Sequence, residues 1–172
     1  FRPCDSKETA AGWYLAMTKK DGPVSLVLTR QKLPLYDETG KEALKGAYII
    51  RKESKETPDI LLMASGSEVE LIYKAAEDLE KKGVSARVIS MPSMEIFNSQ
   101  SEEYKESIMP RSVRRRLAVE AGSSFGWYRY IGLDGDIISL DEFGASGKAE
   151  EVFIEKGFTV ENVINKAMNL IK

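Results

Sequence analysis

Arginines are the residues of this sequence whose positions suggest chemistry, because the chain has no histidine and a single cysteine, Cys4. Without histidine it can form no Ser-His-Asp or Cys-His triad, no HExxH zinc site and no imidazole base. Arg30 comes shortly after residues 24–28, an apolar run typical of a strand. Ligands of open α/β sheets bind outside the carboxyl ends of strands, where a guanidinium can hold phosphate or carboxylate. Arg30 is therefore a candidate anion-binding residue, and a structural ion pair explains its position equally well.

Two further segments are candidates for anion binding. Gly66-Ser67 follows a second predicted strand and precedes a helix, whose free N–H groups and dipole attract anions. The carboxylate of Glu68 at the same helix end opposes an anion, so a structural turn with a helix cap is favoured. A basic cluster before a third strand comprises Arg111, Arg114, Arg115 and Arg116. It could hold phosphate or a partner's carboxylates, but charge runs of this kind are usually solvated faces.

The acidic motifs do not indicate catalysis. Asp134-Gly135-Asp136 superficially resembles a motif that binds a metal and a diphosphate. Such a motif requires a Gly-Asp-Gly tripeptide and a closing Asn-Asn pair, and both are missing, so a turn explains these residues better. The neighbours Asp141-Glu142 and Glu150-Glu151 diverge in either a strand or a helix, so neither pair predicts an acid/base dyad. No glycine-rich phosphate loop of the Walker or Rossmann type is present.

Composition indicates a globular protein of one domain, or of one domain with a fragment of another. The chain has 172 residues, 42% hydrophobic and 30% charged, with 25 basic and 27 acidic side chains. This near balance argues against nucleic-acid binding. No apolar run suits a membrane helix, no signal peptide opens the chain, and one cysteine fits the cytoplasm. The start at Phe1 suggests a piece of a longer chain.

The first part of the chain predicts a helix and a strand without partners. A helix is expected over residues 9–17, capped by Asp5 and Glu8, with Trp13, Leu15 and Ala16 inward. The strand at residues 24–28 follows it. Hydrophobic residues recur with no regular spacing over residues 29–47, which indicates a linker between two units.

The remainder predicts a regular α/β pattern. Strands are expected at residues 47–51 (an edge strand), 59–65, 86–91, 117–119 and 137–140. Helices are expected from a capping box at Ser67 and Glu70 up to residue 82, and at 101–109, 126–131, 149–156 and 159–171. The strand-helix-strand unit over residues 59–91 predicts a right-handed crossover with parallel strands.

Six segments, in order, resemble the carboxyl-terminal third of transketolase along the whole chain. They are Arg-Pro-Cys-Asp-Ser-Lys-Glu-Thr at 2–9, Leu-Thr-Arg-Gln-Lys-Leu-Pro at 28–34, Ala-Ser-Gly-Ser-Glu-Val-Glu at 64–70, Arg-Val-Ile-Ser-Met-Pro at 87–92, Val-Glu-Ala-Gly at 119–122, and Phe-Gly-Ala-Ser-Gly at 143–147 with Gly-Phe-Thr at 157–159. Each segment alone is a weak signal, whereas six in register are specific to this family.

The resemblance implies a division of labour. Residues 1–46 match the tail of the pyrimidine-binding domain and its linker, and residues 47–172 match the C-terminal domain. The implied fold is a three-layer α/β structure, a mostly parallel mixed sheet with helices on both faces. Thiamine diphosphate and its Mg or Ca ion are held mainly by earlier parts of the family's chain, so no catalytic, cofactor-binding or metal-binding residue is expected here. Arg30 matches the arginine that contacts the sugar phosphate, and the departure at Lys32 leaves it intact.

The expected function is that of the C-terminal part of a transketolase, a cytoplasmic homodimer of the pentose phosphate pathway. Such an enzyme transfers two-carbon ketol units between sugar phosphates, and this piece without the rest of its chain is expected to be inactive. One alternative is a piece of another thiamine enzyme: dihydroxyacetone synthase, or deoxyxylulose-phosphate synthase, against which the segment at 28–34 argues. A second alternative is a separate, non-catalytic docking subunit. Neither nucleic acid nor membrane is expected as a partner.

Overall fold

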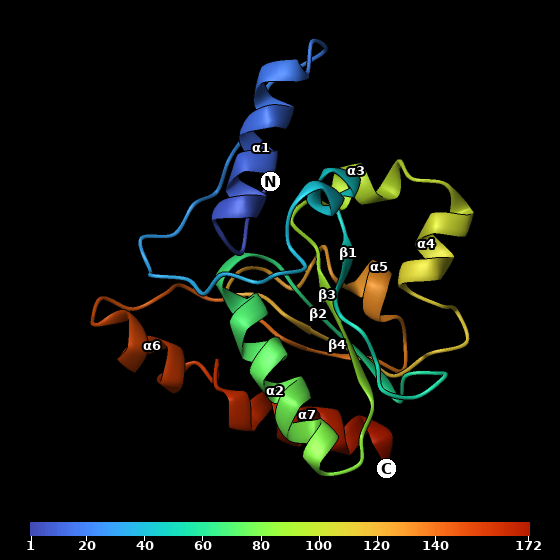
Figure 1. Cartoon of the computed structure of the whole chain (residues 1–172). Coiled ribbons are helices and arrows are strands. Elements are labelled where there is room, and N and C mark those ends of the chain that lie inside the picture. The colour runs from blue at the N-terminus through green and yellow to red at the C-terminus, as the bar shows by residue number, and fades with distance from the viewer.

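A five-stranded sheet forms the centre of the computed structural model, which describes residues 1–172 (Figure 1). The strand order is β1-β3-β2-β4-β5. The strands are β1 (Tyr48–Arg51), β2 (Ile60–Ala64), β3 (Ala86–Ser90), β4 (Arg116–Val119) and β5 (Asp136–Ile138). Strands β2 to β5 run parallel, and β1 lies antiparallel to β3 at the edge. The predicted edge strand and the parallel crossover are confirmed.

The central strands are buried because their sequences are apolar on both faces. Every residue of β2 and β3 is buried. Leu62 and Ala64 of β2 belong to one hydrophobic cluster, whereas Leu61 and Met63 belong to the other. This alternation gives the sheet two covered faces.

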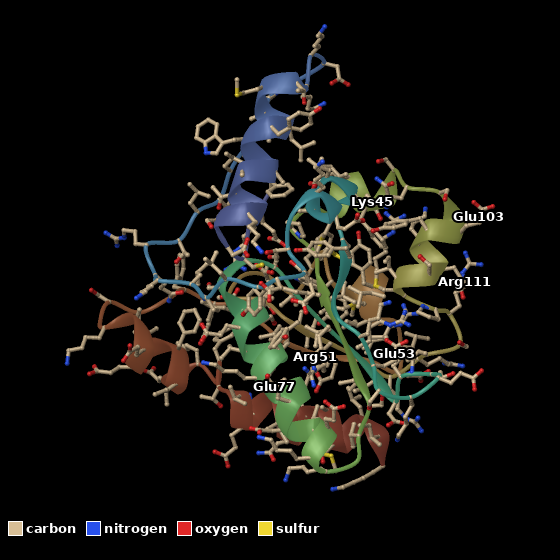
Figure 2. The ribbon with its side chains drawn as sticks, viewed as in Figure 1. Lys45, Arg51, Glu53, Glu77, Glu103 and Arg111 are labelled. Carbon is tan, nitrogen blue, oxygen red and sulfur yellow. The ribbon has the colours of Figure 1, made fainter.

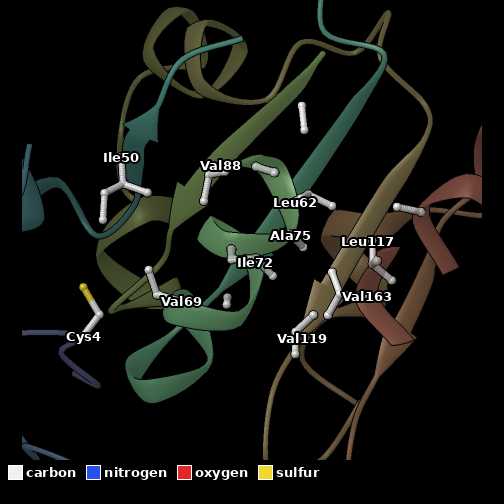
Figure 3. Close-up of a cluster of buried hydrophobic side chains, with 14 of the residues drawn as sticks. Cys4, Ile50, Leu62, Val69, Ile72, Ala75, Val88, Leu117, Val119 and Val163 are labelled. Carbon is white, nitrogen blue, oxygen red and sulfur yellow. The ribbon is translucent and has the colours of Figure 1, made fainter. Parts of the chain in front are cut away.

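Helices cover both faces of the sheet. The bounds are α2 (Val69–Lys81), α3 (Met94–Asn98), α4 (Glu102–Ile108), α5 (Tyr128–Ile131), α6 (Ala149–Glu155) and α7 (Val160–Ile171). Val69, Ile72 and Val163 of α2 and α7 pack on one face (Figure 3), and Phe97 and Trp127 lie in the cluster on the other. The three-layer α/β fold with a mostly parallel mixed sheet is thus confirmed.

Most predicted elements of this part differ from the structure only at their ends. Thr159 caps α7 as expected, since its Oγ1 accepts from the Asn162 amide at 3.2 Å. The sequence analysis missed α3, a short helix that begins directly after its N-cap, Ser93. No helix has the length and apolarity that a membrane crossing requires.

Helix α1 (Ser6–Thr18) stands out from the body of the molecule (Figure 1). Asp5 caps it as predicted, with Oδ1 accepting from the Glu8 amide at 2.8 Å. The expectation that Trp13 points inward is wrong, because its side chain is 56% exposed. Leu15 and Ala16 are half-buried, whereas Tyr14 and Met17 are exposed like Trp13.

The predicted strand at residues 24–28 is wrong. These residues form no sheet ladder. Their hydrogen bonds go to Phe1 alone: the Phe1 nitrogen donates to the Ser25 carbonyl at 2.8 Å, and the Val27 amide donates to the Phe1 carbonyl at 2.9 Å. A strand needs a neighbouring strand to pair its backbone, and this chain supplies none beside that segment.

The second half of the predicted linker is anchored. Tyr36, Thr39 and Ala43 are buried, and a 3₁₀ helix occupies Lys41–Lys45. Gly46 adopts a φ of +84°, and a Cβ on this residue would lie only 2.3 Å from the Phe97 amide nitrogen, so no side chain fits there. Tyr36 and Ala43 join the same core as α2, and the division at 46/47 stays a prediction.

Limited proteolysis should distinguish the anchored half of this segment from the free half. We expect trypsin to cut first after Lys19, Lys20, Arg30 or Lys32, because these residues are exposed and residues 22–35 form only two hydrogen bonds with the rest of the chain, both with Phe1. Mass spectrometry of early fragments gives the positions. First cuts at Lys41 or Lys45 would contradict the anchoring.

Candidate functional site

The carboxyl edge of the sheet carries a charged cluster centred on Arg2. Its Nη1 lies 2.5 Å from Glu68 Oε2 and 3.1 Å from Glu120 Oε1. The same nitrogen donates to the Ser65 carbonyl at 2.5 Å and to its Oγ at 3.1 Å, and Nη2 reaches Ser67 Oγ at 3.5 Å. Ser65 follows β2 and Glu120 follows β4, so the sheet itself brings these groups together.

Glu68 and Glu120 form the acidic side of this cluster. The Glu68 side chain is fully buried, and its Oε2 also accepts from the Ala121 amide at 3.0 Å. Burial raises the pKa of Glu120, although the charge of Arg2 opposes that shift. Burial also disfavours the guanidinium, yet its hydrogen bond with Glu68 keeps the pKa of Arg2 above its ordinary value. One cation thus compensates two carboxylates, and its loss would leave both buried and unpaired.

The candidate anion site at Gly66-Ser67 is contradicted by this cluster. The Gly66 amide donates to the Arg2 carbonyl at 3.1 Å, and a Cβ on Gly66 would lie 2.7 Å from the Arg2 guanidinium carbon. A cation already fills the space in front of this turn. The capping box is also wrong: Gly66–Glu68 is a 3₁₀ turn, and Ser67 Oγ donates to Glu68 at 2.6 Å instead of capping α2.

Glu8 is a third buried carboxylate at the same edge. Its Oε1 accepts from Tyr48 at 2.7 Å and from Ser90 Oγ at 2.6 Å, and its Oε2 accepts from the Cys4 amide at 2.7 Å. The predicted capping box therefore closes on Cys4, one residue before the cap. Glu8 makes no ion pair, and burial raises its pKa despite these three donors. Glu8 fastens the start of α1 to β1 and β3.

Arg30 lies on an exposed loop and makes no ion pair or hydrogen bond. The structural ion pair that would have explained its position is therefore absent. Its neighbours Thr29 and Gln31 line a pocket of about 300 Å³, together with Arg2, Gly66 and Ser67 on the carboxyl edge of the sheet. The two neighbours of Arg30 thus lie at the edge where α/β sheets bind ligands.

The basic cluster at residues 111–116 is dispersed by the fold. Arg116 turns inward and donates to backbone carbonyls, among them that of Tyr130 at 2.8 Å. Arg111, labelled in Figure 2, pairs with Glu102 at the start of α4, and Arg114 pairs with Asp134. These arginines mainly serve local structure. A pocket of about 720 Å³ beside Arg114 and Arg115 is lined by Asp59 and Asp134 as well, so its charges are balanced.

The acidic motifs also have structural partners. Asp141 Oδ1 accepts from the Ser124 amide at 2.8 Å, which ties two loops together. Glu150 and Glu151 lie exposed on α6. No group of three or more carboxylates or thiols is arranged to hold a metal ion.

Comparison with known proteins identifies the family. Residues 46–159 match the family model of the transketolase-like TK C-terminal domain. The chain belongs to this transketolase family. It is 52% identical over 175 residues to the transketolase of Bacillus subtilis, and 48% identical over 171 residues to the probable transketolase of Streptococcus pneumoniae. Each match covers 99% of this chain but 26% of the relative, so the chain spans about a quarter of a transketolase.

Solved transketolase structures share the fold. A Pichia stipitis transketolase in complex with sedoheptulose 7-phosphate superposes with a TM-score of 0.91 and 40% identity, over 99% of this chain and 25% of that one. An inactive β4 tetramer of a split-gene transketolase superposes with a TM-score of 0.73 at 18% identity, which shows a common fold only. The resemblance stated from the sequence is thereby confirmed.

The sequence analysis missed Arg2, Glu68 and Glu120 as one cluster. All three lie inside segments that carry the resemblance to transketolase, and this is the only signal that could have drawn attention to them. Their separations along the chain exceed fifty residues, and only the sheet order brings β2 and β4 together. No periodicity encodes such a meeting.

Glu8→Gln should reduce the pH dependence of stability. Because the pKa of Glu8 is raised in the folded state, folding binds a proton between the unfolded value of about 4.3 and the folded value. Wild-type stability therefore gains from this group as the pH falls through that window. The side-chain amide of the variant does not titrate, and its NH₂ group can donate to the hydroxyls of Tyr48 and Ser90. The variant should therefore lose the gain in stability at low pH, which is about 1.4 kcal/mol for each pH unit by which the pKa of Glu8 is raised.

Urea unfolding followed from neutral to mildly acidic pH measures this effect. Glu77→Gln, at an exposed and unpaired position labelled in Figure 2, is the matched control and should follow the wild type. Glu120 contributes in the same direction and remains in both variants, so part of the slope should persist. Parallel curves for Glu8→Gln and the wild type would show that Glu8 does not titrate as inferred.

Proposed function

We propose that this chain is the C-terminal part of a transketolase, an enzyme that transfers two-carbon ketol units between sugar phosphates. The observation that carries this proposal is the 52% identity with a whole-length transketolase over 99% of the chain. Structures of the Pichia stipitis relative are complexes with xylulose 5-phosphate, fructose 6-phosphate and sedoheptulose 7-phosphate. Sugar phosphates are accordingly the proposed substrates.

The rest of the transketolase chain supplies the cofactor site in this proposal. Thiamine diphosphate with Mg or Ca would provide the carbanion chemistry when bound. The residues of this chain do not fit that group: no metal-binding cluster of carboxylates exists, Glu68 and Glu120 are already paired with Arg2, and Glu8 is occupied by three hydrogen-bond donors. We therefore assign no cofactor-binding, metal-binding or catalytic residue to it.

Arg30 is the proposed substrate-binding residue. Its side chain is exposed and has no partner within the chain. Its neighbours Thr29 and Gln31 line the pocket at the carboxyl edge of the sheet. A planar donor fork binds a phosphate through two parallel hydrogen bonds. Arg30 would hold the phosphate end of the sugar while the other end reacts elsewhere.

The remainder of the chain is also the proposed partner of α1. Trp13, Tyr14 and Met17 of α1 expose 56%, 59% and 82% of their surface, and Val27 and Leu28 on the following loop each expose 55%. Large apolar side chains that are exposed in this number mark a surface that a partner covers. We propose that the preceding part of the pyrimidine-binding domain covers it, within a cytoplasmic homodimer.

Two alternatives remain distinct from this proposal. Dihydroxyacetone synthase would use the same phosphate-binding arginine and differ only in its substrates. The alternative of a separate docking subunit is supported by one observation: the inactive β4 tetramer of a split-gene transketolase shares the fold of this chain. The length of the bacterial relatives, of which this chain spans 26%, favours one continuous enzyme.

The 172-residue chain alone should neither bind thiamine diphosphate nor transfer ketol groups. The reason is that no group of three or more possible metal ligands is present to hold the ion that accompanies the diphosphate. Isothermal calorimetry with thiamine diphosphate and Mg²⁺ provides the measurement. Saturable binding to the isolated chain would overturn the assignment of the cofactor to the rest of the protein.

Arg30→Ala in the full-length enzyme should raise the KM for a phosphorylated ketol donor far more than it lowers kcat. A charge-assisted contact is worth about 1.5–3 kcal/mol, or one to two orders of magnitude in binding. A phosphate remote from the reacting carbon is held equally in the ground and transition states, so the loss falls on KM. Steady-state kinetics with phosphorylated and unphosphorylated donors measure the difference.

Two further variants sharpen this experiment. Arg30→Lys should recover only part of the KM, because an ammonium replaces a planar fork. Lys32→Ala, two residues along the same exposed loop, is the matched control and should change the KM little. Equal loss of activity with both donors would mean that Arg30 has a structural role.

A further inference from the structure

The backbone at Arg30 forms a turn that is closed by the side chain of the preceding residue. Thr29 Oγ1 accepts a hydrogen bond from the Gln31 amide at 3.1 Å, so the bond spans Arg30. Threonine and serine hydroxyls close turns of this kind by taking the place of a backbone carbonyl as the acceptor. The backbone conformation at Arg30 therefore depends on the hydroxyl of Thr29.

This hydrogen bond is local. It is the only one that residues 28–35 form, and both of its partners lie within three residues of the chain. Its geometry therefore does not depend on how any other part of a longer protein is placed. A loop that is ordered before its ligand arrives loses less conformational freedom on binding, which favours affinity.

The two residues that flank Arg30 differ from it in their surroundings. Thr29 and Gln31 line the pocket at the carboxyl edge, together with Gly66 and Ser67, whereas Arg30 does not line it. The turn thus sets its flanking residues against the sheet and leaves Arg30 exposed. Without the Thr29 acceptor, the peptide between Arg30 and Gln31 could rotate, and the direction of the arginine side chain would change with it.

We infer that Thr29 is a positioning residue for Arg30: its hydroxyl, bound to the Gln31 amide, holds the turn from which the guanidinium reaches the substrate phosphate. This inference rests on the proposed phosphate role of Arg30. Thr29 does not itself bind the phosphate; it acts through the arginine that follows it. Its loss therefore weakens binding of phosphorylated substrates and leaves the reacting end of the sugar unaffected.

Thr29→Val in the full-length enzyme tests this inference. Valine keeps the β-branched shape but has no acceptor, so the turn loses the bond that closes it. The KM for a phosphorylated ketol donor should rise about threefold, as expected for one hydrogen bond. The kcat and the KM for an unphosphorylated donor should stay nearly unchanged, because the phosphate is remote from the reacting carbon.

Two rescue variants and a matched control accompany this change. Thr29→Ser keeps the hydroxyl, and Thr29→Asn supplies a carbonyl oxygen that closes the same turn, so both should keep the KM close to that of the wild type. Thr57→Val is the control: Thr57 is exposed before β2, at the opposite edge of the sheet, and both KM values should be unchanged. A rise in Thr29→Ser and Thr29→Asn as large as in Thr29→Val would overturn the inference.

A double-mutant cycle separates positioning from direct binding. In an Arg30→Ala background, Thr29→Val should leave the KM for the phosphorylated donor nearly unchanged, because the residue that Thr29 positions is gone. If the threefold rise persists there, Thr29 does not act through Arg30, and the inference is overturned while the role of Arg30 stands. If Thr29→Val does not fold, Thr29→Ala, which lacks the same acceptor, replaces it in every comparison.

The remaining outcomes are also decisive. An unchanged KM in Thr29→Val, or an equal rise for both donors, would mean that the hydroxyl has no selective role in phosphate binding, and the inference would be overturned. If Arg30→Ala has no effect selective for the phosphorylated donor, the proposed role of Arg30 fails and the inference fails with it.

Discussion

The neutralisation of Glu68 and Glu120 by Arg2 is the interaction on which the arrangement of the carboxyl edge depends. Parallel strands β2 and β4 end side by side, so the residues that follow them meet whatever their separation in sequence. Both carboxylates are largely desolvated there, and a buried charge is tolerated only when it is paired. The first residues of the chain supply that partner and are drawn over the sheet as a result.

This constraint shapes the surrounding backbone. Gly66 turns with a φ of +56° and has no side chain because the guanidinium lies where a Cβ would be. Glu8 strengthens the same junction with hydrogen bonds to β1 and β3, at the cost of burying a carboxylate without a cation. Polar groups therefore join α1 to the domain, while the apolar end of α1 stays open for another part of the protein.

The two edges of the sheet differ in a way that suits a division of roles. At the amino edge, basic and acidic side chains such as Arg114 and Asp134 pair with each other near the surface. At the carboxyl edge, Arg2 compensates Glu68 and Glu120, and the unpaired Arg30 lies between two residues that line a pocket. In the proposed function, this domain contributes to substrate binding through the loop that carries Arg30.

The sequence by itself determined the α/β class, the parallel crossover and the family, because continuous apolar runs, caps at Asp5 and Thr159 and six ordered segments are local signals. It failed at residues 24–28 and at Trp13, where an apolar pattern needs a neighbouring strand or domain that this chain does not contain. It also failed at Gly66-Ser67, where the local pattern of a helix start suggests an anion site. Only the tertiary structure places Arg2 there, because a pairing between residues distant in sequence depends on strand order, and strand order leaves no local trace.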